Sequence, residues 1–247
     1  VDDTLEAMGE EPEYVTTPSG VSGRFTDEGT LEVFEMVLPG KLNTELVTEL
    51  RAAGVNAVGL SGVDGGLVTG PRKSAVRIVE DGKRKIRRGD HAGTPEQVNV
   101  DLLQSLLADG YVPTVSPPML ADDDTTANAD ADRVAALLAA ELGAELVLLT
   151  DVAGVYADPN DPDTLIDEAS TPAEFAAVED AAAGFMSRKV HAAKEALSGG
   201  AEGVVVSDAT LRKPLLAALE GHGTWIAKEA VVDGDDAAAT ANGGESA

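Results

Sequence analysis

The sequence predicts an α/β fold, a three-layer sandwich with a mostly parallel central sheet and an inserted basic β-hairpin. Two observations support this fold class. Several short apolar runs lack polar alternation, which is typical of strands buried on both faces of a parallel sheet. Segments with helical spacing alternate with these runs, and most of them end at a glycine. Strand–helix alternation favours right-handed crossovers. The apolar runs are Asn56–Gly62, Val112–Ser116, Glu145–Thr150 and Gly203–Ser207.

The remaining elements follow in chain order. Val1–Met8 has the composition of a helix, and a second helix is expected at Glu28–Leu38. Small polar residues from about Gly234 onward indicate a disordered acidic tail. The helices expected between and after the strands are Leu42–Ala53, Val100–Asp109, Asp130–Leu142, Ser187–Ser198 and Leu211–Leu219.

A basic segment interrupts this alternation between residues 72 and 88. Ser74–Val79 and Lys85–Arg88 flank Glu80-Asp81-Gly82, and Asp-Gly between extended runs is a hairpin signal. The segment contains eight cations against Glu80 and Asp81, although the whole chain has a net charge of −26. Such clustering predicts a surface with a specific electrostatic task.

Composition excludes several classes of function. A net charge of −26 makes nucleic acid an improbable partner, whereas 43% hydrophobic content argues against a disordered acidic chain. An acidic surface suits concentrated salt, where the Debye length falls to about 3 Å at 1 M, so we expect a halophilic protein. The absence of cysteine excludes thiolate metal sites, and three widely spaced histidines form no metal cluster, although Asp, Glu and Asn oxygens could still hold Mg²⁺. No apolar run reaches the roughly 18 residues of a membrane span, and a cytoplasmic protein is expected.

Three segments are candidates for a site at the carboxyl edge of the sheet. Arg24, in Ser22–Asp27, offers two parallel donors to a carboxylate, or it is an ordinary surface arginine. Asn128 and Asp132 are four residues apart at a helix start, where both residue types also serve as caps. Lys189 precedes or begins a helix and faces either a phosphoryl group or solvent.

Taken together, these segments resemble the amino-acid kinase family, and N-acetylglutamate kinases in particular. The resemblance covers nearly the whole chain in the family's order. The matching motifs are Gly23–Asp27, Glu32–Val33, Glu35–Leu38, Gly40–Asn43, Gly59–Gly62, Asn128–Asp132, Leu148–Val155, Met186–Lys189 and Gly223–Ile226.

The resemblance implies a transferase that uses ATP and Mg²⁺ to phosphorylate a carboxylate. Arg24 and Asn128 would bind the acceptor, Lys189 would neutralise the phosphoryl group in flight, and Asp132 would orient that lysine. A carboxylate is already a nucleophile at pH 7, so positioning and positive charge are the remaining requirements. The residues expected near the nucleotide are Thr150, Asp151, Val152, Tyr156, Ser207 and Asp208.

The family pattern also predicts the lobes and one departure. Residues 1–144 are expected to bind the acceptor, residues 145–233 the nucleotide, and residues 234–247 to form the tail. Family members open with a strand bearing Lys-x-Gly-Gly and a Gly-rich turn. Neither precedes Val1 here, so roughly 35 residues, the length of a strand–helix–strand unit, are expected to be missing, and the chain as printed is expected to be inactive.

Gly62–Leu67, Gly70–Lys73 and the basic hairpin most resemble the branch that acts on carrier-bound substrates. Those enzymes phosphorylate glutamate or aminoadipate attached to LysW, a small acidic carrier protein of arginine and lysine biosynthesis. An acidic enzyme needs a local cationic dock to meet an acidic carrier. The residues expected to form this dock are Arg72, Lys73, Lys83, Arg84 and Lys85.

Alternatives remain at this point. Free N-acetylglutamate is the other acceptor that the motifs fit, and the hairpin could instead bind ATP phosphates or the protein's own acidic surface. A different class is a non-catalytic binding module without the first lysine. Glutamate and aminoadipate differ by one methylene, worth only about 1–3 kcal/mol in a pocket, so the sequence does not separate them. The family resemblance favours a homodimer.

Overall fold

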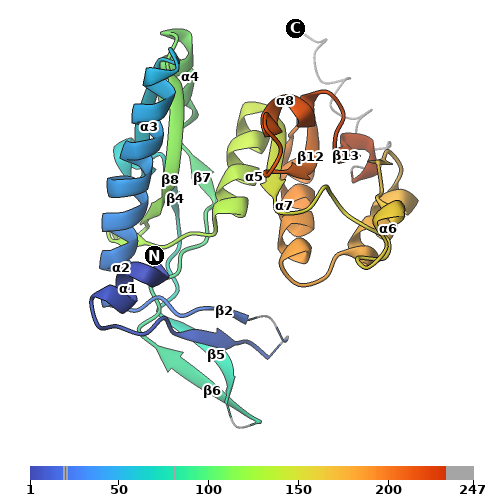
Figure 1. The fold of residues 1–247 in the computed structure, drawn as a ribbon. Coiled ribbons are helices and arrows are strands. Elements are labelled where there is room, and N and C mark those ends of the chain that lie inside the picture. The colour runs from blue at the N-terminus through green and yellow to red at the C-terminus, as the bar shows by residue number, and fades with distance from the viewer. Residues whose placement is uncertain (19, 21, 81, 232–247) are drawn as a thin grey trace, which may run out of the picture. The chain divides into compact units, whose positions relative to one another are not determined.

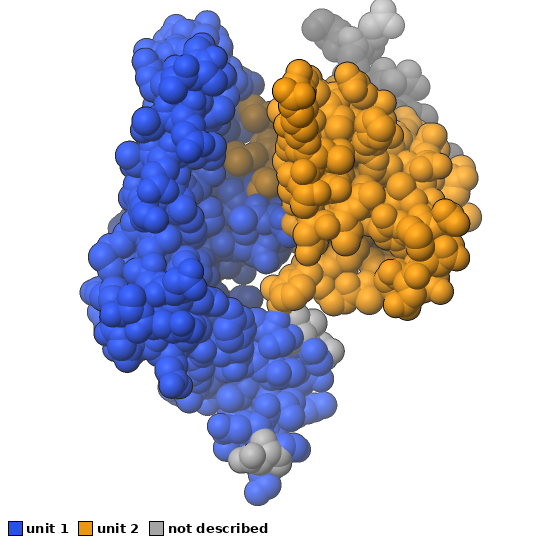
Figure 2. Space-filling model, in the orientation of Figure 1, with its two compact units in different colours: residues 1–134 blue, residues 135–247 orange. Residues whose placement is uncertain are grey.

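A computed structural model describes residues 1–18, 20, 22–80 and 82–231. The chain divides into two compact units, residues 1–134 and 135–247 (Figure 2). The division falls within helix α5 (Ala131–Leu142), ten residues before the lobe boundary that the sequence predicted. Within the described residues each unit contains its own main sheet. The expected tail, residues 234–247, lies outside the described residues.

The main sheet of unit 1 has the strand order β3-β8-β4-β7, with β9 paired to β8. Strands β3, β8 and β4 are mutually parallel, and β7 and β9 are antiparallel to their neighbours. The strand predicted at Val112–Ser116 continues beyond Pro117–Pro118, and its ladder with β3 shifts register there, so it bypasses prolines that cannot donate. The strands are β3 (Ala57–Gly62), β4 (Val68–Gly70), β7 (Gln97–Val98), β8 (Val112–Ala121) and β9 (Thr126–Ala127).

The predicted break between two helices at Pro39–Gly40 is wrong. Helix α2 (Glu28–Glu35) passes through the π-helical segment η1 (Met36–Leu42) directly into α3 (Asn43–Ala52). A π-helical turn shifts the hydrogen-bond pattern, so the missing N–H of Pro39 does not end the helix. The start of α2 was predicted correctly, because the Asp27 carboxylate accepts a hydrogen bond from the Thr30 N–H at 2.8 Å.

Asn43 attaches α3 to the middle of this sheet. Its buried amide donates to the Thr114 carbonyl at 2.8 Å and to the Ser116 hydroxyl at 2.6 Å. Gly59 on β3 is required here, because a Cβ at that position would come within 2.3 Å of the Asn43 side-chain oxygen. This contact fixes the register of α3 over the carboxyl-terminal half of β3 and β8.

The N-terminal part of unit 1 contains α1 (Asp2–Ala7) and the short antiparallel pair β1 (Tyr14–Thr16) and β2 (Ser22–Arg24). Leu5 of α1 is buried against Val33 and Val37. The sequence did not predict β1 and β2, because three-residue strands are too short to show a period. Unit 1 also contains η2 (Asp64–Gly66) and α4 (Val100–Ala108), which contacts β8.

The predicted basic hairpin is confirmed. Strands β5 (Ala75–Glu80) and β6 (Lys83–Arg88) pair antiparallel from Ala75↔Arg88 to Glu80↔Lys83. Gly82 has a φ of 72°, as a hairpin turn requires, while Asp81 lies outside the described residues. Every residue of β6 is exposed, and the hairpin extends from the remainder of unit 1 (Figure 1).

The sheet of unit 2 has the order β10-β12-β13-β11. Strands β10 (Glu145–Thr150) and β12 (Gly203–Asp208) are parallel, as the sequence predicted, whereas β13 (Thr224–Ala227) runs antiparallel to β12. Gly223, with a φ of +127°, allows this turn, because a Cβ there would meet the Val206 carbonyl oxygen at 2.3 Å. Strand β11 (Glu168–Ala169) pairs in parallel with β13 and is the last strand of this sheet.

The core of unit 2 lies between this sheet and helices α5 and α7. Leu146, Leu148, Val204 and Val206 face those helices, while α8 contacts β10 and β12 (Figure 1). No helix within the described ranges is long and apolar enough to cross a membrane. The remaining elements are α6 (Pro172–Ala181), α7 (Phe185–Gly199), α8 (Pro214–Leu219), η3 (Pro162–Thr164) and η4 (Lys228–Ala230).

Candidate active site

Arg24, at the end of β2, is hydrogen-bonded to neighbouring side chains through one arm of its guanidinium. Its Nη2 donates to the Asp2 carboxylate and, at 2.6 Å, to the Tyr14 hydroxyl. The guanidinium also lies over the rings of Tyr14 and Phe34, at 4.9 and 5.7 Å from their centroids. Its Nη1 is buried and has no hydrogen-bond partner among the described residues. One arm of the guanidinium is therefore fixed by the protein, and the other is available to a ligand.

Asp2 provides the electrostatic part of this arrangement. Burial alone would raise the pKa of Asp2, but hydrogen bonds from Arg24 and Tyr14 and the charge of Arg24 outweigh it and leave the pKa below its ordinary value. The carboxylate therefore stays ionised beside Arg24 at neutral pH, and the guanidinium is oriented before any ligand arrives.

Asn128 is connected to the strand that bears Arg24 through Thr26. The Asn128 side-chain N–H donates to the Thr26 hydroxyl at 3.1 Å, and Thr26 is fully buried. Backbone bonds complete the connection, from Asn128 N–H to the His91 carbonyl at 2.9 Å and from His91 N–H to the Thr26 carbonyl at 2.7 Å. The Asn128 side-chain oxygen is buried and has no partner in the described part of the chain.

Asp90 is a buried carboxyl behind these segments that sequence reasoning missed. It is 4% exposed and accepts from the Thr26 N–H at 3.4 Å and the Ala92 N–H at 3.3 Å. Burial raises the pKa of Asp90, although both hydrogen bonds and the charges of Lys73 and His91 oppose the rise. Its only sequence signal was an acidic residue directly after the basic run.

The two proposed phosphoryl-transfer residues lie on two helices and belong to different units. Asp132 is half-buried in the first turn of α5, and Lys189 is half-buried in the second turn of α7, which follows Gly184. At the start of α5 the Asp130 carboxylate accepts a hydrogen bond from the Arg133 N–H at 3.2 Å.

The predicted nucleotide residues gather at the carboxyl ends of β10 and β12. Thr150 pairs with Asp208 and Leu149 with Ser207 in the parallel ladder. Hydrogen bonds from the side chain and backbone of Thr210 hold the pKa of Asp208 below its ordinary value. Ser207 is 1% exposed, and its hydroxyl has no hydrogen-bond partner within the described residues. This edge is the usual ligand position in open α/β sheets.

The loop after β10 contains the other predicted nucleotide residues. The Thr150 hydroxyl donates to the Asp151 carboxylate at 3.1 Å, and the exposed Val152 follows. Tyr156 is fixed farther along by a β-bridge to Leu165. Four of the residues that the family resemblance placed near the nucleotide, Thr150, Asp151, Ser207 and Asp208, therefore lie at one edge of the sheet.

Three buried side-chain polar atoms lack a partner within the described residues: Arg24 Nη1, Asn128 Oδ1 and Ser207 Oγ. All three belong to residues that the sequence had predicted to bind a ligand. Leaving a buried donor or acceptor unsatisfied costs about 1–3 kcal/mol, so each such atom in a native protein requires an explanation.

The predicted carrier-docking cations fall into two groups. Arg72 pairs with Asp123 at 2.8 Å, and Lys85 pairs with Glu80. Hydrogen bonds from Thr125, followed by the contact with Arg72, lower the pKa of Asp123 to about 2. Lys73, Lys83 and Arg84 are exposed and make no ion pair with the described residues. For Arg72 and Lys85, binding to the protein's own acidic surface is thus the observed arrangement.

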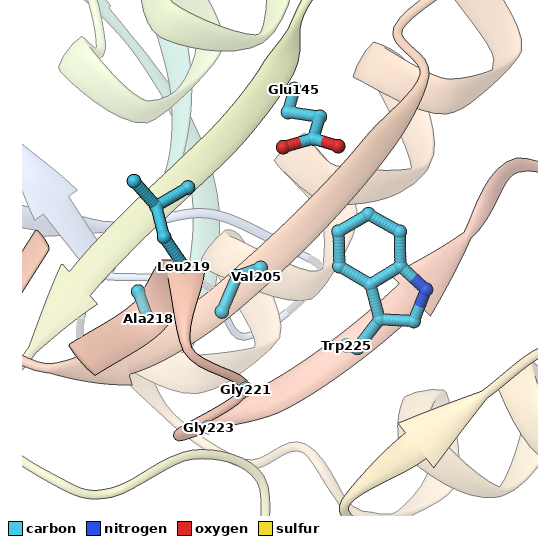
Figure 3. Close-up of a pocket in the computed structure, with 7 residues that line it drawn as sticks. All are labelled: Glu145, Val205, Ala218, Leu219, Gly221, Gly223 and Trp225. Carbon is cyan, nitrogen blue, oxygen red and sulfur yellow. The ribbon is translucent and has the colours of Figure 1, made fainter. Parts of the chain in front are cut away.

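A cavity of about 180 Å³ in unit 2 lies away from these residues, on the α8 face of the sheet (Figure 3). The Trp225 indole and the Glu145 carboxylate border it, and Val205 lines it from β12. Glu145 begins β10, whereas the candidate nucleotide residues end that strand. The cavity is therefore separate from the candidate site. The lining residues are Glu145, Val205, Ala218, Leu219, Gly221, Gly223 and Trp225.

Comparison with known proteins gives matches over most of the chain. A sequence model described as "Amino acid kinase family" matches residues 1–208. LysW-aminoadipate kinase of Thermus thermophilus is 47% identical over 227 residues, covering 90% of this chain and 83% of that protein. LysW-aminoadipate kinase of Deinococcus radiodurans is 48% identical over 90% of this chain and 76% of its own length. Acetylglutamate kinase of Methanopyrus kandleri is 42% identical, with coverage of 92% and 86%.

Solved structures confirm the predicted α/β fold class. N-acetylglutamate synthase from Neisseria gonorrhoeae, complexed with coenzyme A and N-acetyl-glutamate, matches with a TM-score of 0.72 at 26% identity, covering 97% of this chain and 54% of that chain. An isopentenyl phosphate kinase matches with a TM-score of 0.54 at 21% identity, covering 83% and 75%.

Proposed function

The chain belongs to the amino acid kinase family, and we propose that it transfers a phosphoryl group from ATP to the side-chain carboxylate of glutamate or aminoadipate carried by a LysW-type protein. One observation carries the proposal: in the described part of the chain, the buried side-chain polar atoms without partners belong to Arg24 and Asn128 of unit 1 and to Ser207 of unit 2. An acceptor and a nucleotide are two ligands of the kind such atoms require.

Acceptor binding is assigned to Arg24 and Asn128. The free Nη1 of Arg24 donates to an acceptor carboxylate, while Asp2 and Tyr14 keep the guanidinium in place. The side-chain oxygen of Asn128 accepts a hydrogen bond from an N–H of the substrate, because the side-chain N–H of Asn128 is already bound to Thr26. The substrate is thus recognised by one hydrogen-bond donor and one hydrogen-bond acceptor of the protein, and both are positioned before the substrate binds.

Phosphoryl transfer requires positive charge where two anions meet. Lys189 supplies it to the transferring group, and Asp132 orients that lysine. Bound ATP supplies the phosphoryl group, and Mg²⁺ on its phosphates neutralises further charge. Thr150, Asp151, Ser207 and Asp208 fit the nucleotide, because they lie at one strand edge and the Ser207 hydroxyl is unsatisfied. The described residues contain no cluster of three or more His, Asp or Glu able to hold a metal. We therefore assign most of the Mg²⁺ ligands to the phosphates of ATP.

The carrier-bound acceptor is supported by the basic hairpin and by the relatives named LysW-aminoadipate kinases. A chain with net charge −26 would repel an acidic carrier except at such a surface. Free N-acetylglutamate is the second candidate, favoured by the acetylglutamate kinase relative. Lysine or arginine biosynthesis, a cytoplasmic location, a homodimer and adaptation to high salt belong to the same proposal.

Trapping of the product tests the reaction. The full-length protein is incubated with ATP, Mg²⁺ and hydroxylamine, which converts an acyl phosphate into a stable hydroxamate. We expect hydroxamate on LysW carrying aminoadipate or glutamate, and none on LysW alone. Hydroxamate formed only from N-acetylglutamate would move the function to the second candidate. ATP-independent binding of LysW without hydroxamate would indicate a binding module.

A further inference from the structure

The two faces of the β5–β6 hairpin differ in their contacts with the rest of unit 1. Directly paired residues of an antiparallel ladder project from the same face. The pairs Ile78↔Lys85, Val76↔Arg87 and Glu80↔Lys83 therefore define one face, called the inner face. The outer face is defined by the three alternating pairs, Ala75↔Arg88, Arg77↔Ile86 and Val79↔Arg84.

Internal partners occupy the inner face. Ile78 is 6% exposed, so this face packs against the protein. Lys85 pairs with Glu80, and Arg87 pairs with Glu13 at 2.8 Å and lies over the Phe25 ring at 5.0 Å. Most of the inner cations are thus already neutralised within unit 1.

The outer face has the opposite character. Arg77, Arg84 and Arg88 are exposed, and none of them makes an ion pair with a described residue. Ile86 is 68% exposed, more than any other valine, leucine or isoleucine described, and Val79 is 37% exposed. The most exposed aliphatic side chain therefore lies on the same face as three unneutralised arginines.

The arginines surround Ile86. Arg77 lies directly opposite Ile86 across the ladder, at a Cβ distance of about 5 Å. Arg84 and Arg88 precede and follow Ile86 by two residues on β6, each roughly 7 Å away along the strand. An apolar centre ringed by arginines is the arrangement of a small protein-binding surface, because arginine and buried apolar anchors dominate such contacts.

We propose that this outer face receives the acidic carrier protein, and that the carrier presents carboxylates around one apolar side chain that covers Ile86. The inference rests on the proposed function, which it narrows to one face of the hairpin. Charge complementarity selects the occupant, since the rest of this chain is strongly acidic and a cationic surface on it attracts an acidic partner. Of the docking residues predicted from sequence, only Arg84 lies on this face.

Two matched double variants separate the faces. Arg84→Glu with Arg88→Glu reverses two outer cations, and Lys83→Glu with Lys85→Glu reverses two inner cations of the same strand, so net charge changes equally. Isothermal titration with LysW carrying aminoadipate at about 0.15 M salt should show at least a tenfold weaker Kd for the outer pair and a several times smaller loss for the inner pair. Circular dichroism confirms that both variants are folded.

Ile86→Ser tests the apolar centre. It should weaken LysW binding by about tenfold at both low and molar salt, because contact with an apolar side chain is not screened. An unchanged Kd would remove the apolar part of the proposal. Equal losses from the inner and outer pairs would overturn the choice of face, because net charge alone would then explain binding. Loss of self-association without loss of LysW binding would instead make the face a contact between copies of this chain.

The hydroxamate assay keeps this inference separate from the proposed function. If the wild type modifies LysW-aminoadipate and the outer variant does so with unchanged kcat/KM, only the docking face is wrong. If the wild type neither binds nor modifies LysW-aminoadipate, the proposed function fails with it.

Discussion

Replacing Arg24 with lysine separates the charge of this residue from its geometry. The guanidinium uses Nη2 for Asp2 and Tyr14 and leaves Nη1 for the acceptor. A single ammonium group has no such fork, so it binds either Asp2 or the acceptor well, but not both. The substitution therefore removes one charge-assisted hydrogen bond to the acceptor while the positive charge is retained.

The size of the effect follows from that bond. A hydrogen bond to a charged group contributes about 1.5–3 kcal/mol. At about 1.4 kcal/mol per factor of ten, kcat/KM for the acceptor should fall roughly 10- to 150-fold, chiefly through a higher KM. The KM for ATP should not change, because the nucleotide is assigned to β10 and β12 of the other unit.

Steady-state kinetics of ADP release, with LysW-aminoadipate and ATP varied in turn, measure both constants. Arg51→Lys is the matched control, since the Nη1 of Arg51 donates to Asn56 at 3.1 Å in a part of unit 1 that has no assigned role. The control should leave both KM values unchanged. A raised KM for ATP with an unchanged acceptor KM would refute the placement of Arg24.

Three further substitutions test the transfer residues and the buried carboxyl. Lys189→Ala should lower kcat by about 100-fold, which is the usual effect of losing one preorganised charge donor, without a change in circular dichroism. A loss below tenfold would show that Lys189 takes no part in phosphoryl transfer. Asp132→Asn should lower kcat similarly, and a change in KM alone would contradict an orienting role. Asp90→Asn should raise the melting temperature at pH 7, because the amide oxygen still accepts from Thr26 and Ala92 while the cost of a buried charge disappears. Since burial raises the folded pKa of Asp90 above 3.8, the wild type regains stability as pH falls through that pKa, and the difference measured by thermal melts should shrink on acidification.

The sequence predicted the elements whose signals are local. The apolar runs at Glu145–Thr150 and Gly203–Ser207 predicted parallel strands, and their pairing brings Thr150 and Asp208 together as expected. The run at Glu145–Thr150 is nevertheless an edge strand in the described sheet and does not lie in its middle. Asp-Gly between extended runs predicted the hairpin for an equally local reason. Two separate helices were predicted at Glu28–Leu38 and Leu42–Ala53, but a π-helical turn joins them.

Features that depend on tertiary contacts could not be predicted. Nothing adjacent to Arg72 in the chain indicates that Asp123 neutralises it, and nothing near Asp90 indicates its burial beside Thr26. The orientation of the hairpin cations was also hidden, because it depends on the register and on which face Ile78 buries. The sequence therefore indicated where the cations lie, and the structure indicates which of them remain unneutralised.

The ratio of kcat/KM for LysW-aminoadipate to that for free N-acetylglutamate, measured in the full-length enzyme, tests the central claim most directly. Docking on the hairpin adds binding energy that the free acceptor lacks, so a preference of at least about 100-fold for the carrier-bound acceptor is expected, equivalent to about 2.7 kcal/mol. The preference should fall in the Arg84→Glu, Arg88→Glu variant while kcat/KM for N-acetylglutamate stays constant. Equal use of both acceptors, or a preference for free N-acetylglutamate, would contradict a kinase of carrier-bound substrates.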